Sequence, residues 1–156
     1  MKPYVGTALR EANDLFTRMR ACETQTDIEQ YGPAQFSDNI RAILVAVRPT
    51  SATDVEALWA HRAELQQRLL SEMGDVLILP VASILAPPLG QNSFDVDGTA
   101  LSWSQALASS RAISILGLPS VVVPVATSES GLPIGIQIIA RPWREHHAFA
   151  IAATLS

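Results

Sequence analysis

Cysteine is almost absent from this sequence. Cys22 is the only one among 156 residues, so no disulfide can form within the chain and no cysteine-based metal site can be built. The near-absence of cysteine indicates a reducing compartment, and we therefore expect the protein in the cytoplasm.

Long apolar runs and clusters of basic residues are also missing. The first residues carry no apolar signal-peptide core, and the most apolar run, Val76 to Leu89, is interrupted by three prolines. That run is too short to cross a bilayer. With a net charge of −4 and a pI near 5.3, we expect neither nucleic acid nor membrane as a partner.

Apolar residues, by contrast, are plentiful. They make up 48% of the chain, and the mean hydropathy is +0.21. A chain of this length is one domain on the usual prior. Such a composition predicts either unusually thorough burial or an apolar face left for a partner.

Two Val- and Ile-rich runs dominate the second half. Ser120 to Val125 and Ile134 to Ala140 are typical of buried strands, and each follows a Gly-Leu-Pro triplet. The polar stretch from Thr127 to Gly131 reads as a surface turn. The short reversal predicts an antiparallel pair within a larger sheet.

Helical periodicity marks the first half. One apolar face combines Val5, Leu9, Ala12, Phe16 and Met19, with Asn13 among the residues of the polar side. The polar segment Cys22 to Pro33 is predicted to be a connection. Ser37 is predicted to cap a short helix whose inward residues are Ile40, Ile43, Leu44 and Val47.

A longer helix is predicted next. Thr53 and Glu56 form a capping box that opens a helix to about Met73, with Gly74 as its stop. Its buried stripe is predicted to be Val55, Leu58, Leu65 and Leu69.

The remaining elements complete a single domain, 1–156, of the α/β class. A short strand is expected at 75–79, a loop through Gly90, irregular structure at 91–101, a helix at 103–116 and a last helix from Glu145. Residues 1–74 are the helical part, and 75–156 the strand-helix-strand-strand-helix part. Three strands suggest an incomplete sheet.

Four separated segments resemble the amidase signature family of Ser-Ser-Lys amide hydrolases. They are Asp75 to Pro80 with Ala86-Pro87, Gly117 to Pro124, Gly131 to Gln137, and Arg141-Pro-Trp143 with Glu145. The resemblance covers residues 75–155 well and the first seventy loosely. It implies the C-terminal portion of that family's mixed β-sheet flanked by helices. Ser114 departs from the family, which often has Asn there.

The resemblance also implies a mechanism whose parts can be sought. A serine attacks the amide carbonyl, a second serine relays the proton, and a lysine is the base. The only lysine is Lys2, at the extreme N-terminus, and the only Ser-Ser pair, Ser109-Ser110, lies within a predicted helix. No Gly-Gly pair is present. In family members the triad lies upstream of the matched region, so we expect no catalytic residue here and no turnover by the chain alone.

The segment 91–103 takes the place of a loop that lines the substrate pocket in family members. The resemblance therefore makes Phe94, Asp95 and Trp103 the substrate-binding candidates. The alternative is an ordinary solvated loop.

Other candidate sites have simpler interpretations. Adjacent histidines on a helix point about 100° apart, so His146 and His147 are poor ligands for one ion. His61 is expected at the surface. Arg141 and Trp143 are expected to close a strand and pack against the last helix. No metal and no cofactor is expected.

Three functions stay open at this point. The first is the C-terminal segment of an amidase that hydrolyses carboxylic amide C–N bonds of a small substrate, supplying scaffold and part of the pocket. Its partner would be the missing N-terminal half. The second is a non-catalytic binding module with a homodimer or other protein partner, and the third is one chain of a two-chain amidase.

Overall fold

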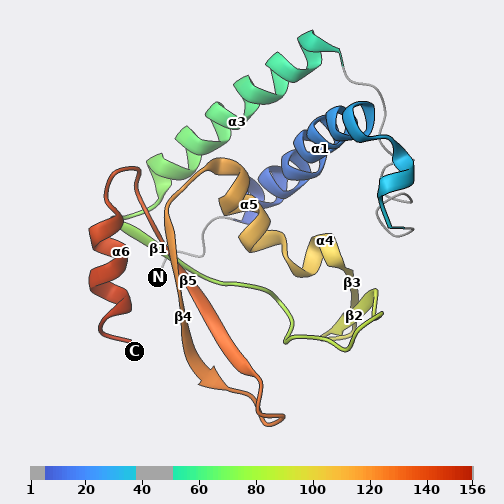
Figure 1. Cartoon of the computed structure of the whole chain (residues 1–156). Coiled ribbons are helices and arrows are strands. Elements are labelled where there is room, and N and C mark those ends of the chain that lie inside the picture. Colours follow the sequence, from blue (N-terminus) through green and yellow to red (C-terminus); the bar gives the residue numbers. More distant parts are fainter. Residues whose placement is uncertain (1–5, 38–50, 156) are drawn as a thin grey trace.

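The computed structural model describes residues 6–37 and 51–155 (Figure 1). The predicted helix after Ser37, and both Val5 and Lys2, lie outside these residues. In chain order the elements are α1 (Gly6–Tyr31), η1 (Pro33–Gln35), α3 (Ala52–Glu72), β1 (Val76–Pro80), β2 (Ser93–Val96), β3 (Thr99–Ser102), α4 (Trp103–Ala106), α5 (Ala108–Leu116), β4 (Ser120–Thr127), β5 (Pro133–Ala140) and α6 (Glu145–Ala152).

The main sheet has three antiparallel strands in the order β1-β5-β4. Ile138 of the central strand lies opposite Ile78 on one side and Val121 on the other. The predicted antiparallel pair is therefore confirmed. Because side chains alternate across a strand, Ile139 faces one layer of helices and Ile138 the other.

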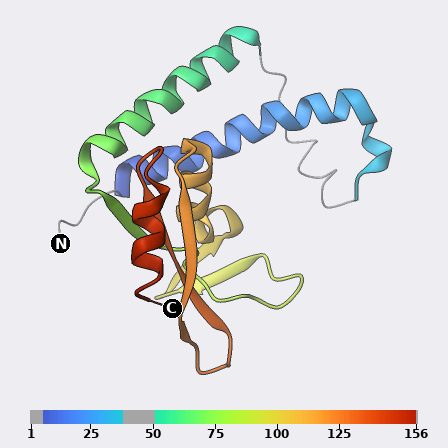
Figure 2. The same cartoon turned by 60° about the vertical axis from the view of Figure 1, so that its left-hand side comes forward.

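Helices cover both faces of this sheet (Figures 1 and 2). On one face α1, α3 and α5 contact one another and enclose the larger core, whose buried residues are Ala12, Leu15, Met19, Leu58, Leu65, Leu69, Ala112, Ile113, Leu116, Leu118 and Ile139. On the other face α6 packs over β4 and β5, where Ala148 and Ala152 meet Val123 and Ile138. Burial of these apolar side chains is the main stabilising term.

The first helix is longer than predicted. It runs on through the polar residues from Cys22 to Tyr31 instead of ending there. No glycine or proline interrupts this stretch. The Cys22 and Thr24 side chains donate hydrogen bonds to the backbone carbonyls four residues earlier, those of Arg18 and Arg20. The helix ends at Gly32, which has a φ of 75°, and Pro33 follows it. The polar stretch is therefore helical, and the predicted connection is wrong.

The start of α3 also differs from the predicted one. Ser51, not Thr53, is the N-cap, and its hydroxyl accepts from the Asp54 backbone N–H at 3.2 Å while the Asp54 carboxylate accepts from the Ser51 N–H. The Ser51 hydroxyl also donates to the Asp54 carboxylate at 2.6 Å. This bond, followed by the one from the Ser51 N–H, lowers the pKa of Asp54. The buried residues Leu58, Leu65 and Leu69 are as predicted, while Val55 is half-buried.

The segment predicted to be irregular is a hairpin. Strands β2 and β3 pair antiparallel around Asp97 and Gly98, which have φ values of 51° and 77°. An Asp-Gly pair between alternating residues is a strong signal for a two-residue turn. The Asp95 carboxylate accepts from the Gly98 N–H at 3.2 Å and closes the turn.

The helix predicted at 103–116 forms as two pieces that change direction at Leu107. The second piece ends as predicted at Gly117, whose φ of 66° is the left-handed conformation that glycine adopts without cost. Arg62 and Gln66 of α3 donate to the last free carbonyls, those of Ile115 and Leu116.

Candidate substrate pocket

A hollow lies at the carboxyl end of β1. Its volume is about 520 Å³, and its lining residues are Leu9, Arg10, Asn13, Asp14, Pro80, Ser83, Gln105, Ala108 and Ser109. Helix α1 forms one wall, and the chain that leaves β1, together with α4 and α5, forms the other. We refer to it as the β1 hollow.

Hydrogen bonds fix the floor of the β1 hollow. The Ser109 hydroxyl donates to the Pro80 carbonyl at 2.7 Å and lies 3.1 Å from that of Val81. The buried Gln137 side chain also donates to the Pro80 carbonyl, at 3.1 Å. The chain is held further by the Ser83 N–H, which donates to the Ala106 carbonyl at 2.8 Å. These hydrogen bonds hold the end of β1 against α5, although Val81 and Ser109 are 28 residues apart in the sequence.

The α1 wall depends on one buried amide. Asn13 is only 6% exposed. Its oxygen accepts from Arg111 Nε at 2.9 Å, and its nitrogen donates to the Ser104 hydroxyl at 3.3 Å. Arg111 also donates to Thr17 Oγ1 at 2.6 Å and lies over the Phe16 ring at 4.4 Å. Burial lowers the pKa of Arg111, which nevertheless stays a cation at ordinary pH.

This set of groups suits binding and not covalent catalysis. The Ser109 proton is committed to backbone carbonyls, and the Ser110 hydroxyl donates to the Leu107 carbonyl at 3.1 Å. Within residues 6–37 and 51–155 neither serine meets a lysine or histidine that could take its proton. Arg10 and Asp14 remain at the rim as an exposed cation and anion. A small molecule with an apolar body and polar ends fits such a lining.

Of the three residues predicted to bind substrate, Phe94 and Asp95 lie on β2 of the neighbouring hairpin, and Trp103 begins α4 directly after it. Phe94 is buried, and its ring meets that of Trp103 edge-on at 4.7 Å between centroids. Trp103 donates through Nε1 to the Gln91 carbonyl at 3.1 Å, and Asp95 serves the hairpin turn. None of the three is among the described residues that line the β1 hollow, although α4, which supplies Gln105, begins at Trp103.

Sequence reasoning missed Asn13, which it placed on the polar side of α1. The available signal was a short amide next to Ala12, at the border of the apolar stripe. Its buried position is set by Arg111, 98 residues away, and no local pattern reveals such a partner.

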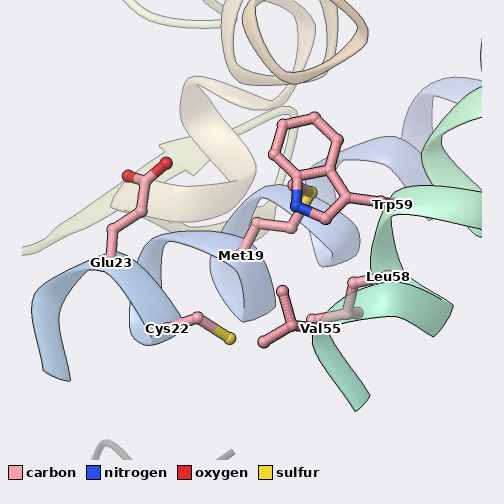
Figure 3. Close-up of a pocket in the computed structure, with 6 residues that line it drawn as sticks. All are labelled: Met19, Cys22, Glu23, Val55, Leu58 and Trp59. Atoms are coloured by element: carbon pink, nitrogen blue, oxygen red, sulfur yellow. The ribbon is translucent and has the colours of Figure 1, made fainter. Parts of the chain in front are cut away.

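A smaller hollow of about 230 Å³ lies between α1 and α3 (Figure 3). Met19, Val55, Leu58 and Trp59 give it an apolar lining, and the Cys22 side chain points toward Val55, whereas the Glu23 carboxylate points away from them. The Cys22 thiol donates to the Arg18 carbonyl. Nothing in this lining resembles a reactive centre.

The remaining candidates behave as follows. No group of three metal-ligating side chains occurs in the described part of the chain, and His61 is a partly exposed residue 3.6 Å from Glu64. Arg141 is structural, but its partners are not on the last helix: it donates to the carbonyls of Leu70, Met73 and Gly74 at the end of α3. The prediction for Trp143 was wrong: its side chain is 89% exposed and its φ is 64°.

No helix in the described ranges has the length and apolar character needed to cross a membrane.

Comparison with known proteins gives a consistent result. Residues 6–149 match the sequence model of the family described as Amidase. Fatty acid amide hydrolases of Medicago truncatula and Arabidopsis thaliana are 28% and 30% identical over 134 and 125 residues. These matches cover 83% and 78% of this chain but 22% and 21% of the relatives, so the chain spans about a fifth of their length.

The fold agrees as well. A solved structure described as "Crystal structure of amidase" superposes with a TM-score of 0.79 at 24% identity, over 95% of this chain and 36% of that one. The predicted α/β class and the predicted family are therefore confirmed, and the chain belongs to the amidase family.

Proposed function

We propose that this chain supplies scaffold and part of the substrate pocket to an amidase that hydrolyses carboxylic amide C–N bonds. The observation that supports this most is the family match over residues 6–149, joined to a 520 Å³ hollow that carries no nucleophile–base pair among the described residues. The serines and the lysine would come from sequence outside the matched part, whether in a longer protein or in a second polypeptide.

The proposed pocket combines the β1 hollow with the adjacent β2–β3 hairpin. Trp103, whose ring rests edge-on against the buried Phe94, would offer apolar contact to an acyl chain, and Arg10, Asp14 and Asp95 would offer polar contacts around it. Water would be the acyl acceptor, and no cofactor is needed for such chemistry. On this proposal the 156-residue chain alone does not turn over.

The test uses a fluorophosphonate that labels activated serines. We expect no labelling of the isolated chain, because Ser109 and Ser110 both donate to carbonyls and lack a base. Labelling is expected only when the chain is produced together with the catalytic portion of a related amidase, and Ser110→Ala, outside the lining of the β1 hollow, should leave that labelling unchanged. Stoichiometric labelling of the chain by itself would overturn the proposal.

A second function is supported by a different observation. Large apolar side chains are exposed on the sheet and on α6, among them Ile78, Val122, Val125 and Phe149. Such exposure is typical of interaction surfaces. If the chain is a non-catalytic amidase-like module, it should fold and bind its partner, but no fluorophosphonate labelling should appear when it is produced with the catalytic portion of a related amidase.

A further inference from the structure

Two amide side chains that line the β1 hollow are held by their oxygen atoms. Asn13 Oδ1 accepts from Arg111 Nε at 2.9 Å. Gln105 Oε1 accepts from the Ser102 backbone N–H at 2.8 Å. Guanidinium and backbone N–H groups can only donate, so each partner determines which end of the amide is the oxygen. The NH₂ ends are therefore the ends that remain for other contacts.

Both NH₂ groups have hydrogens without an acceptor in the described ranges 6–37 and 51–155. Asn13 Nδ2 donates one of its two hydrogens to the Ser104 hydroxyl at 3.3 Å. Gln105 Nε2 donates to no residue of these ranges. Because Asn13 is only 6% exposed, its second hydrogen has little access to water. A buried donor without an acceptor costs free energy, and an acceptor bound in the hollow would remove that cost.

The two amides belong to neighbouring parts of the wall. Ser104, which accepts from Asn13, directly precedes Gln105 in α4. The contact between α1 and α4 therefore brings both NH₂ groups to the same side of the hollow, where a single ligand group can reach them. A carbonyl oxygen has two lone pairs and can accept from two N–H donors at once.

The charges of the lining favour a neutral ligand group over an anion. Arg10 lies one turn before Asn13 on α1, and Asp14 follows Asn13 directly. They are the only charged residues among the described lining residues, so the lining has no net charge. The Asp14 carboxylate repels an anion but accepts from an N–H group. A carboxamide offers both a carbonyl oxygen for the two amide donors and N–H groups for Asp14.

We propose that the β1 hollow binds a carboxamide group whose oxygen accepts from Asn13 Nδ2 and Gln105 Nε2. The inference rests on the proposed function where it concerns the substrate. A carbonyl oxygen under attack becomes negative, and Asp14 opposes such charge in this hollow, which also has no nucleophile–base pair among the described residues. The bound group is therefore a second carboxamide, separate from the amide that is cleaved. The substrate class is a diamide.

Nuclear magnetic resonance of the ¹⁵N-labelled chain tests the binding, because it observes side-chain NH₂ groups directly. The chain is titrated with butanamide, butanoate and butylamine, which share an apolar body and differ in the polar end. We expect butanamide to shift the NH₂ signals of Asn13 and Gln105 until they saturate. Butanoate should bind more weakly, and butylamine, which has no carbonyl oxygen, should not shift these two signals. Tighter binding of butanoate, or equal shifts with butylamine, would overturn the proposal.

Two variants remove the donors and keep the shape. Asn13→Asp and Gln105→Glu retain the oxygen that accepts from Arg111 or Ser102 and replace the NH₂ group by a second oxygen. Each should raise the dissociation constant for butanamide at least about tenfold. Asn92→Asp adds the same charge at an exposed position outside the lining and is the matched control. Circular dichroism confirms folding, and wild-type affinity in both folded donor variants would contradict the assignment.

The titration needs no hydrolysis, so its result is separate from the fluorophosphonate labelling. Labelling of the assembled enzyme without butanamide binding to the chain would refute this inference alone. Butanamide binding without labelling would refute the proposed amidase and leave a carboxamide-binding module. In an enzyme that does label, Gln105→Glu should raise KM for pentanediamide, which has two carboxamides, by more than KM for butanamide. An equal increase would show that the hollow holds the amide that is cleaved, against the proposal.

Discussion

Replacement of Arg111 by alanine should destabilise the fold more than its partly exposed position suggests. The side chain joins α5 to α1 through Asn13 and Thr17 and lies over the Phe16 ring. Its loss leaves the Asn13 oxygen buried without a donor, which costs about 1–3 kcal/mol. The cation–π contact adds about 0.5–1 kcal/mol. We expect a loss of about 3 kcal/mol in the free energy of unfolding.

The assay is urea unfolding followed by circular dichroism. With a slope of about 2 kcal/mol per molar, Arg111→Ala should lower the midpoint by about 1.5 M. Arg68→Ala is the matched control, because Arg68 also reaches α1, through a 2.8 Å pair with Glu11 whose side chains are 42% and 37% exposed. Such pairs contribute about 0–1 kcal/mol.

A double-mutant cycle with Asn13→Ala assigns the cause. If the Asn13 oxygen is the main term, the two substitutions together should cost less than their sum by at least about 0.5 kcal/mol. Equal losses for Arg111→Ala and Arg68→Ala, or full additivity with Asn13→Ala, would refute the reasoning.

Three further results are expected. Gly117→Ala should lower the melting temperature by more than Gly131→Ala. Both residues have positive φ, but only at Gly117 would a new Cβ collide with the Arg62 guanidinium. Equal shifts would show that the Arg62 side chain moves aside without cost. Arg141→Ala should cost about 2 kcal/mol in urea unfolding, because three carbonyls at the end of α3 lose a charged donor, and Arg144→Ala is the control. The pKa of Asp54 is lower in the folded chain than its ordinary 3.8. The stabilisation by this carboxylate is therefore complete above pH 3.8 and is lost as the pH falls through the folded pKa. Asp54→Asn should flatten this dependence of stability on acid pH, and an unchanged pH profile would contradict the prediction.

Local patterns were sufficient for several parts of the fold. Val- and Ile-rich runs bounded by Gly-Leu-Pro triplets predicted β4 and β5, since β-branched residues favour strands and glycine and proline end other structure. The spacing of Leu58, Leu65 and Leu69 predicted the buried face of α3. Gly117 predicted the end of α5. The Asp-Gly turn of the β2–β3 hairpin was also visible in the sequence. The segment was nevertheless predicted to be irregular, because most of its residues are polar.

The candidate pocket was far less accessible from sequence. Phe94, Asp95 and Trp103 were selected because of their place in the chain, and their role as substrate contacts stays a prediction. The β1 hollow depends on α1, which resembled family members only loosely in sequence. Its polar residues are ordinary surface types, so composition gave no reason to single out Asn13, and Ser109 was considered only as half of the Ser-Ser pair.

By itself the sequence determined the α/β class and most elements of the second half, because these depend on short-range periodicity and on turn residues with distinctive backbone preferences. The family was predicted from the resemblance of four separated motifs. Only the tertiary structure decided which polar groups are buried, which serine protons are already committed and which sheet edges stay open. Those properties depend on contacts between residues as far apart as Asn13 and Arg111. Such contacts exist only after the helices have packed against the sheet.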